Sequence, residues 1–359
     1  MREPATAPAR VAALRSTSQL HHRPRAIRHP VDVVRGAGPV QAQDPRAARL
    51  AFRARSRGLK AADIDRARTE ERSLLRAWCM RKTVHLIASD DAGWLLPIFS
   101  ETIVRWARRR LAHFGLDARG QERALEVLHA AVDREGPLTR PQLGDRLERE
   151  GFETGQEFKV HLWLLATLDG ELCLGPDRGG QTCLVRTSDW IGPLEHRPSD
   201  ASLAELARRY LRAYGPVSER DLARWAGLPL RDARAGFARI AGELEAAGEM
   251  FTLRRPRRTA RSPVVRLLGA FDNYNLGYVD RGFALEPQHE KRVVPGGGIV
   301  RPAIVVDGRL VGTWSSKRSG DRLAVTVEPF ATLEPEIEEA IAAEIDDLGR
   351  FEALSAAPA

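Results

Sequence analysis

The chain has 359 residues, enough for two to four domains of ordinary size. Hydrophobic residues make up 43% of it, and no apolar run approaches the roughly 18 residues that span a bilayer, which excludes a membrane-spanning helix. The first ten residues carry charge but no apolar segment, which excludes a secretion signal. We therefore expect a cytoplasmic protein with a disordered leader at residues 1–15.

The net charge of +8 comes almost entirely from arginine. Arginine matches phosphate geometry, so the charge favours a polyanionic partner, although a GC-rich genome also produces arginine-rich chains. The three cysteines, Cys79, Cys173 and Cys183, have no CxxC spacing, which argues against a structural zinc site or an iron–sulfur cluster. We expect buried thiols, and no metal or cofactor.

The stretch from Val40 to Arg57 begins with the clearest helix signal. Asp44 followed by Pro45 predicts a helix start, because a short acidic side chain caps free amides and proline suits the first helical position. An apolar pattern then follows at helical spacing, and Gly58 is the expected stop. Residues 16–57 thus give two helical stretches.

Gln41 and Gln43 precede this helix in chain that we expect to be extended. Residues i and i+2 share a side in extended chain, so two uncharged amides would face one small volume while Ala42 turns into the core. A Gln-x-Gln pair alone is more often a solvated or satisfied polar edge.

The next elements complete a first module at residues 16–115. Ala61–Arg68 and Glu70–Trp78 read as helices, with Thr69 as a cap for the second, and Thr83–Ile87 alternates as a strand does. Several helices closed by a short strand are typical of a winged-helix module.

A weak repeat follows, in which Gly136–Leu143 matches Gly215–Leu222. In each copy a hydroxyl residue precedes an acidic or amide residue by three positions, which is the spacing of a capping box. Hairpins are expected at Glu171–Val185 and Met250–Leu268. The repeat of helices, turn and hairpin predicts two further winged-helix modules, at residues 116–195 and 196–262.

Beyond Pro263 short strands replace helices. The strands are expected at Val264–Leu268, Ile299–Val306, Leu310–Trp314 and Leu323–Val327, with Asp307-Gly308 as a tight turn and Glu334–Leu348 as a closing helix. The fold class is therefore α+β: three tandem winged-helix modules followed by a small C-terminal β-barrel-like domain at residues 263–359.

Four segments in this order resemble the AlkZ/YcaQ family of winged-helix DNA glycosylases. They are the Gln-Ala-Gln of the first helix lead-in, WCMRKTVHL (78–86), LLGAFDNYNLGY (267–278) and VVDGRLVGTW (305–314). The resemblance implies that Gln41 and Gln43 are catalytic. It also implies DNA repair, with bulky natural-product adducts or interstrand crosslinks in scope.

Two glutamines suit one class of substrate. A purine alkylated at N7 is cationic and leaves without protonation, so amides that orient water and place carbonyl dipoles near positive charge are sufficient. Neutral bases need an acid that glutamine cannot supply. Lysines are few, and Lys82 reads as a surface residue rather than a Schiff-base nucleophile, so we expect a monofunctional glycosylase.

The resemblance places two further residues near the pocket without defined roles. His85 lies in the TVHL strand, where a lone histidine is usually a satisfied core residue. Asp272 either contacts DNA or the motif, or caps the following turn.

Arginines supply the expected DNA contacts. In the wing of the third module they are Arg254, Arg255, Arg257, Arg258 and Arg261. On the helix after Trp106 they are Arg108 and Arg109. No aromatic-rich platform for single strands is present, so the expected partner is double-stranded DNA with an alkylated purine, bound by a monomer associated with the nucleoid.

Two other functions compete with this interpretation. A non-enzymatic winged-helix regulator would bind the same duplex, but regulators usually pair one winged helix with an effector domain. An inactive relative that shields damaged DNA is disfavoured by the intact Gln-Ala-Gln. The sequence leaves open which adduct is the substrate, whether crosslinks are unhooked, and whether the role is general repair or self-resistance to a toxin.

Overall fold

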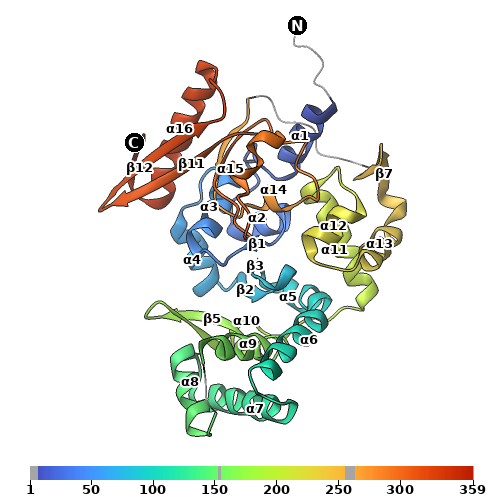
Figure 1. The fold of residues 1–359 in the computed structure, drawn as a ribbon, viewed down its shortest axis with the longest axis vertical. Coiled ribbons are helices and arrows are strands. Elements are labelled where there is room, and N and C mark those ends of the chain that lie inside the picture. The colour runs from blue at the N-terminus through green and yellow to red at the C-terminus, as the bar shows by residue number, and fades with distance from the viewer. Residues whose placement is uncertain (1–6, 153–154, 255–262, 359) are drawn as a thin grey trace. The chain divides into compact units, whose positions relative to one another are not determined.

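The computed structural model describes residues 7–152, 155–254 and 263–358 (Figure 1). The chain forms two compact units, one combining residues 1–65 with 204–359 and the other comprising residues 66–203. The first expected module is thus divided at residue 65, so its boundary at residue 115 does not coincide with a boundary between compact units.

The first unit begins with helices and a short strand that precede and include the Gln-Ala-Gln stretch. They are α1 (Ala7–Ser18), α2 (Pro30–Ala37), β1 (Val40–Gln41), α3 (Pro45–Arg55) and the start of α4 (Ala61–Thr69). The expectation of a disordered leader up to residue 15 is wrong, because α1 begins at Ala7. Ala12 is fully buried, and the Arg15 guanidinium lies 4.0 Å from the ring centre of Tyr278. These contacts fix the segment in the core.

The second unit contains an antiparallel sheet with the strand order β3-β2-β5-β6-β4. Its strands are β2 (Leu74–Trp78), β3 (Val84–Ala88), β4 (Leu138–Thr139), β5 (Leu172–Arg178) and β6 (Gln181–Arg186). The helix expected at Glu70–Trp78 is wrong, since Leu74–Trp78 pairs in register with β3. Buried pairing with a neighbouring strand outweighs the weak helix preference of this short segment.

The helices of the second unit pack around this sheet. They are α5 (Ala92–Leu95), α6 (Pro97–His113), α7 (Ala118–Glu135), α8 (Arg140–Arg149), α9 (Gln156–Ala166) and α10 (Thr187–Ile191). The hairpin expected at Glu171–Val185 is confirmed as β5–β6. At the start of α8, the Thr139 amide donates to the Gln142 side chain at 2.9 Å, as the cap spacing predicts.

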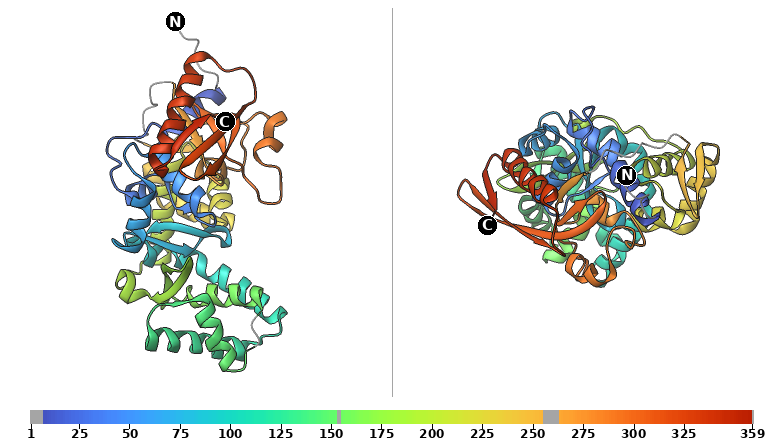
Figure 2. Two further views of the ribbon diagram at one scale, coloured as in Figure 1. Left: turned by 90° about the vertical axis from the view of Figure 1, so that its left-hand side faces the viewer. Right: turned by 90° about the horizontal axis from the view of Figure 1, so that it is seen from above.

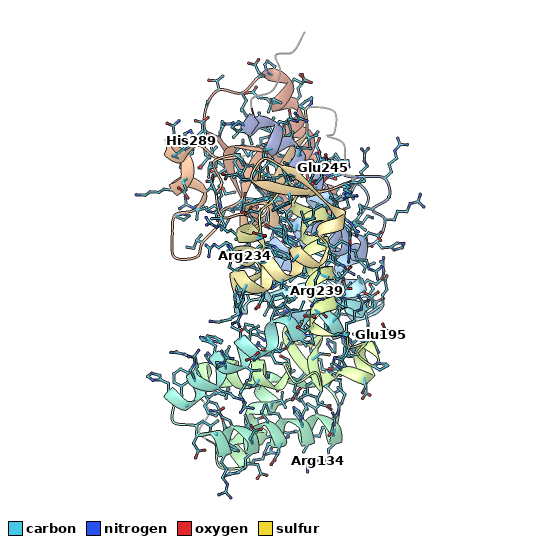
Figure 3. All side chains as sticks on the ribbon, turned by 90° about the vertical axis from the view of Figure 1, so that its right-hand side faces the viewer. Arg134, Glu195, Arg234, Arg239, Glu245 and His289 are labelled. Carbon is cyan, nitrogen blue, oxygen red and sulfur yellow. The ribbon has the colours of Figure 1, made fainter. Side chains whose placement is uncertain are left out.

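The corresponding elements in the first unit are α11 (Ser199–Tyr214), α12 (Glu219–Ala226), α13 (Leu230–Arg239), β7 (Leu244–Ala247) and β8 (Met250–Leu253). Ser218 and Asp221 cap α12 reciprocally. The hairpin expected at Met250–Leu268 is wrong, because β8 pairs with β7 and the strand at Val265 joins another sheet. Arg234 and Arg239 stand on α13, and Glu245 stands on β7 (Figure 3).

A five-stranded sheet in the order β13-β12-β11-β10-β9 ends the first unit. Its strands are β9 (Val265–Leu268), β10 (Ala303–Val306), β11 (Arg309–Ser319), β12 (Arg322–Pro329) and β13 (Ser355–Pro358), with the short helices α14 (Asn273–Leu276) and α15 (Glu290–Val293) between β9 and β10. In the described strands β13 and β9 form the two edges, so the sheet is open and the expected barrel is not closed. The long helix α16 (Pro335–Glu352) packs against β9 and β13 (Figure 2).

The turn at Asp307-Gly308 confirms the sequence signal for a tight connection. Both residues have positive φ, 49° and 87°, and Val306 pairs with Arg309 across them. Two-residue turns of this kind match strand twist, and glycine at the second position adopts positive φ without strain. All three cysteines are buried and free. None of the described helices is long and apolar enough to cross a membrane.

Candidate active site

Gln41 and Gln43 lie side by side at the entrance to α3. The Gln41 Nε2 donates a hydrogen bond to the Gln43 Oε1 at 3.0 Å, and Ala42 between them is only 4% exposed. The expected geometry is therefore confirmed: the two amides share one side of an extended segment while Ala42 enters the core. Because the side chains touch, they present one joint polar surface to solvent.

Asp44 and Pro45 fix where α3 begins. The Asp44 Oδ1 accepts hydrogen bonds from the amides of Arg46 and Ala47, both at 2.9 Å, and Pro45 occupies the first helical position. Asp44 itself has extended backbone angles, as an N-cap residue should. The helix ends at Arg55 with Ser56 as its C-cap, two residues before the expected stop at Gly58.

The opposite end of α3 is held by a buried ion pair. Both Arg55 and Asp272 have fully buried side chains, and two parallel hydrogen bonds of 2.8 Å join them. Burial opposes the charge of Arg55, but the coulombic attraction of Asp272 outweighs it, so the pKa of Arg55 is raised. Asp272 also caps α14 through the Tyr274 amide. The structure therefore supports the capping alternative for Asp272 rather than a position in a pocket.

Gln19 extends this ion pair into a network. Its Oε1 accepts from the Arg55 Nη2 at 2.7 Å, and its Nε2 donates to the carbonyls of Ala37 and Ala213. Ala37 ends α2, a few residues before the glutamine pair. The network thus fixes both the end of α3 and the chain that leads into Gln41. Sequence reasoning missed it, because Arg55 and Asp272 are 217 positions apart with no local signal that pairs them.

Arg53, two residues earlier in the helix, anchors α3 to α16. Its side chain is fully buried, donates to the Leu267 carbonyl at 2.6 Å, and pairs with Glu344 at 3.0 Å and Asp347 at 3.1 Å. Burial raises the pKa of Glu344, but the charges of Arg53, Arg23 and Arg266 lower it more, so the pKa is lowered overall and the carboxylate stays ionised. The C-terminal half of α3 is therefore rigidly bound to β9 and α16.

His85 is a core residue of β3. It is 1% exposed, its Nδ1 lies 3.0 Å from the Thr83 carbonyl oxygen, and its Nε2 has no hydrogen-bond partner in the described residues. Burial and the nearby Arg81 lower the pKa of His85 to about 3, so the ring is neutral at physiological pH. These facts match the core alternative and give no support for a cationic role in a pocket.

The expected DNA-binding arginines differ in their surroundings. Arg254 and Arg109 are exposed, while Arg108 pairs with Glu122 at 2.8 Å. The other arginines expected in the wing, Arg255, Arg257, Arg258 and Arg261, lie outside the described residues. Their contact with DNA stays a prediction.

A pocket of about 440 Å³ opens at the N-terminal half of α3, and sequence reasoning missed it. We call it the α3–β11 pocket, since one wall is α3 and another is the middle of β11. Its lining consists of Asp44, Arg46, Ala47, Leu50, Ala270, Arg301, Pro302, Thr313, Trp314, Ser315, Ser316 and Glu328. The sequence separates these residues into five segments, so only the fold brings them together.

Comparisons with known proteins all find DNA glycosylases. The model of the family described as DNA glycosylase AlkZ-like matches residues 34–351. A curated protein of Streptomyces sahachiroi, named an interstrand DNA cross-link repair glycosylase, is 29% identical over 270 residues, covering 67% of this chain and 70% of its own. The solved structure of Streptomyces sahachiroi DNA glycosylase AlkZ superposes with a TM-score of 0.82 at 26% identity, over 99% of both chains.

Proposed function

Because the chain belongs to the AlkZ-like DNA glycosylase family, we propose that it hydrolyses the N-glycosidic bond of cationic N7-alkylated purines in double-stranded DNA. Gln41 and Gln43 are the catalytic residues of this proposal. The observation that carries it is their direct contact, 3.0 Å apart, on the side of an extended segment that faces away from the core.

In the proposed reaction the C1′–N9 bond breaks and its electron pair leaves with the base, which becomes neutral. The sugar passes through an oxocarbenium-like state, and a water oxygen bonds to C1′ while its proton goes to solvent. The amide oxygens of the glutamine pair orient this water and place negative dipole ends near the developing positive charge. The mutual hydrogen bond preorganises the two amides, so little reorientation is needed during the reaction.

The chemistry of an amide limits the substrate. Neither glutamine donates a proton strongly enough to release a neutral base such as uracil, and neither is a strong general base. A base that already carries a positive charge needs no such acid. The proposed substrates are therefore cationic purines, and the name of the Streptomyces relative extends the proposal to interstrand crosslinks joined through guanine N7.

The product of the proposed reaction is an intact abasic site. A lyase would need an amine that forms a Schiff base with the sugar. The Lys82 Nζ lies 5.0 Å from the ring centre of Trp106, so this side chain is held against the face of an aromatic ring. We therefore propose a monofunctional enzyme.

The proposed partner is duplex DNA, bound by one copy of the chain in the cytoplasm at the nucleoid. Exposed arginines such as Arg254 and Arg109 suit phosphate contacts. A non-enzymatic regulator is not favoured, since the family match spans most of the chain and is to glycosylases.

One assay tests the proposal. Purified protein is incubated with a duplex that carries a single N7-methylguanine, and the products are separated before and after treatment with alkali. We expect strand cleavage only after alkali, and none on a matched duplex with uracil. Borohydride trapping of a covalent protein–DNA adduct would overturn the monofunctional assignment, and unbroken DNA after alkali would overturn the glycosylase proposal itself.

A further inference from the structure

Two large apolar side chains are exposed among the described residues, Val279 at 53% and Ile299 at 50%. A single exposed apolar residue is ordinary on a protein surface, so its surroundings must show whether a partner covers it. Both residues belong to the first unit. Their surroundings differ in charge and in their connection to the glutamine pair.

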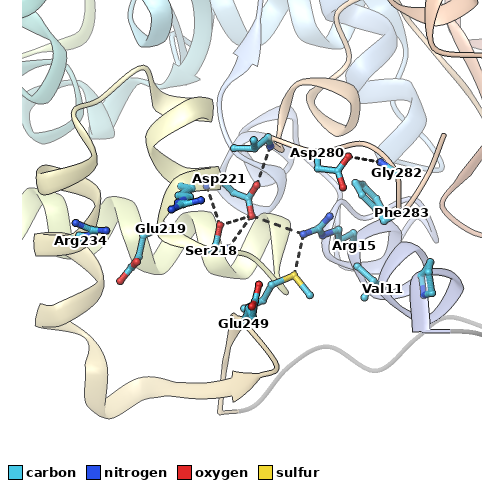
Figure 4. A pocket seen from close by; sticks show the side chains of 14 residues that line it. Val11, Arg15, Ser218, Glu219, Asp221, Arg234, Glu249, Asp280, Gly282 and Phe283 are labelled. Atoms are coloured by element: carbon cyan, nitrogen blue, oxygen red, sulfur yellow. Dashed lines mark hydrogen bonds and ion pairs between the residues drawn. The ribbon is translucent and has the colours of Figure 1, made fainter. Parts of the chain in front are cut away.

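Val279 lies in acidic surroundings. It lines a pocket of about 900 Å³, together with residues of α1, α12 and β8 (Figure 4). The charged side chains of this lining are four carboxylates and three guanidinium groups: Glu219, Asp221, Glu249 and Asp280, and Arg15, Arg220 and Arg234. Carboxylates outnumber cations, which does not favour a polyanion such as DNA. Of the described residues, none from α3 or its lead-in lines this pocket.

Ile299 ends a tight turn, residues 294–299 with the sequence VPGGGI. Its amide donates to the Gly296 carbonyl at 3.0 Å, and Gly296, Gly297 and Gly298 have positive φ, which glycine adopts without strain. No described protein atom lies within 4 Å of the place where a side chain would start at any of these glycines. The tip of the turn is therefore a strip of bare backbone in open space, with the exposed Ile299 side chain at its end.

The base of the turn is fixed in the core. Val293 and Val300, on its two sides, are 0% and 4% exposed. The Arg301 amide donates to the Val293 carbonyl at 2.9 Å, which joins the two sides, and the Phe271 amide donates to the Val300 carbonyl at 3.2 Å. An element that is already ordered loses little conformational entropy when it binds a partner, so this turn suits insertion.

The segment after β9 connects the turn to the glutamine pair. Ala270 lines the α3–β11 pocket together with Arg301 and with Asp44, the residue that follows the pair. The Asn273 side chain donates to the Ala37 carbonyl at 3.2 Å, at the end of the helix that precedes the pair. The residue that bonds to the turn lies between Ala270 and Asn273. The turn is thus fixed to the same part of the fold as the glutamine pair.

Cations flank this uncharged turn. Lys291 and Arg292 precede it and Arg301 follows it, and no acidic residue occurs from 291 to 301. Lys291 and Arg301 are exposed, as Ile299 is. The chain belongs to a family of DNA glycosylases, which makes DNA the expected polyanion. Duplex DNA presents apolar base faces between two charged backbones, so an apolar tip between cations matches it.

We propose that Ile299 is a wedge that enters the base stack of duplex DNA beside the lesion while the damaged nucleotide is extruded toward Gln41 and Gln43. The inference rests on the proposed function for the place to which the nucleotide moves. Extrusion unstacks a base, and an apolar side chain in the vacated place offsets part of that free energy. Isoleucine is among the side chains that separate base steps in this way. Lys291 and Arg301 contact phosphates on the two sides of the wedge.

The test compares a paired lesion with an unpaired one. Ile299→Ala removes most of the wedge, whereas Ile299→Leu keeps an apolar side chain of the same size. Val279→Ala is the matched control, because it shortens an equally exposed apolar side chain in acidic surroundings. Single-turnover release of N7-methylguanine is measured from two duplexes. In one the lesion is paired with cytosine, and in the other it lies in an unpaired bubble, where extrusion requires little unstacking.

Ile299→Ala should slow release from the paired duplex by about 10-fold or more and from the bubble by less than about threefold, because only the paired lesion must leave a stack. Ile299→Leu and Val279→Ala should both stay within about twofold of wild type on either duplex, since each leaves an apolar wedge in place. Equal slowing on the two duplexes, or wild-type rates for Ile299→Ala at an unchanged melting temperature, would overturn the inference.

A second measurement separates the wedge from the chemistry. The lesion carries a 2′-fluorine that prevents hydrolysis, and a neighbouring 2-aminopurine fluoresces more strongly when it unstacks. At saturating protein, wild type and Val279→Ala should raise the fluorescence, and Ile299→Ala should raise it by less than about half as much. No rise in wild type, or an equal rise in all variants, would overturn the wedge. A wild-type rise without release of base from either hydrolysable duplex would leave the wedge standing and refute the proposed function.

Discussion

The two ends of α3 carry polar groups of opposite character. At its N-terminus the side chains of Gln41, Gln43 and Asp44 reach solvent. At its C-terminus Arg53 and Arg55 are fully buried, and each is neutralised by carboxylates from distant parts of the chain. One helix of eleven residues thus joins a polar surface that reaches solvent with a charged network that is buried.

This difference separates residues that stabilise the fold from residues that reach solvent within one helix. A buried ion pair fixes position because removing either partner leaves an uncompensated charge in the core. Exposed amides contribute little to stability, so their replacement should leave the fold intact. Substitutions at the two ends should therefore have effects of different kinds.

The largest expected effect is at the C-terminus of α3, where the ion pair is buried. Arg55→Met leaves the Asp272 carboxylate buried without its partner, so the free energy of unfolding should fall by about 3–5 kcal/mol. Urea unfolding monitored by circular dichroism measures it. The double variant Arg55→Met/Asp272→Asn removes both charges and keeps a capping side chain for α14, so it should recover much of the loss. A single variant as stable as wild type would contradict the anchoring role of the pair.

The next effect concerns the glutamine pair before α3, and it changes the rate of base release rather than the free energy of unfolding. Gln41→Ala and Gln43→Ala should each unfold within about 0.5 kcal/mol of wild type, since the side chains are not in the core. Each should slow release of N7-methylguanine by roughly 10²- to 10³-fold, the scale of losing one preorganised polar group. Single-turnover kinetics decide it, and wild-type rates in both variants would remove the catalytic centre from the proposal.

The contact between the glutamines sharpens this prediction. Because the Gln41 Nε2 bonds to the Gln43 Oε1, the pair acts as one unit, and the double alanine variant should be about as slow as the slower single variant. Multiplied effects would show instead that the two amides act on different atoms.

The smallest expected effect is at Asp44, the residue that caps the N-terminus of α3. Asp44→Ala removes the cap of α3 and should cost about 1 kcal/mol of stability, whereas Asp44→Asn should cost little because asparagine caps equally well. Asp117→Ala, which removes the equivalent cap of α7, is the matched control. Thermal unfolding of the three variants compares them, and equal losses in the alanine and asparagine variants of Asp44 would mean that charge, not capping, holds the helix start.

Local signals predicted local structure well. Asp44-Pro45, the alternation at Thr83–Ile87 and the Asp307-Gly308 turn each depend on neighbours within a few positions, and each was confirmed. The segment Leu74–Trp78 was predicted wrongly because its strand depends on pairing with β3. The position of the glutamine pair could therefore be predicted, because capping and extended geometry are local.

What holds and surrounds that pair could not be predicted. Arg55 reads as one more arginine at the end of a helix, and nothing near it in sequence indicates a carboxylate 217 positions later. The α3–β11 pocket depends on the packing of α3 against a sheet whose strands begin more than 200 positions away. Contacts of this range are set by the tertiary fold, and a single sequence does not encode them in any short pattern.

The distance along the chain between the arginines of α3 and their partners also orders events during synthesis. Domains tend to fold from the N-terminus as the chain leaves the ribosome. Arg53 bonds to Glu344, 291 positions later, so α3 emerges early and must wait for nearly the whole chain before its charges are neutralised. Residues 66–203 form a compact unit of their own and are complete well before that point. A chain that ends before α16 therefore lacks both carboxylate partners of Arg53, although its middle unit is already complete.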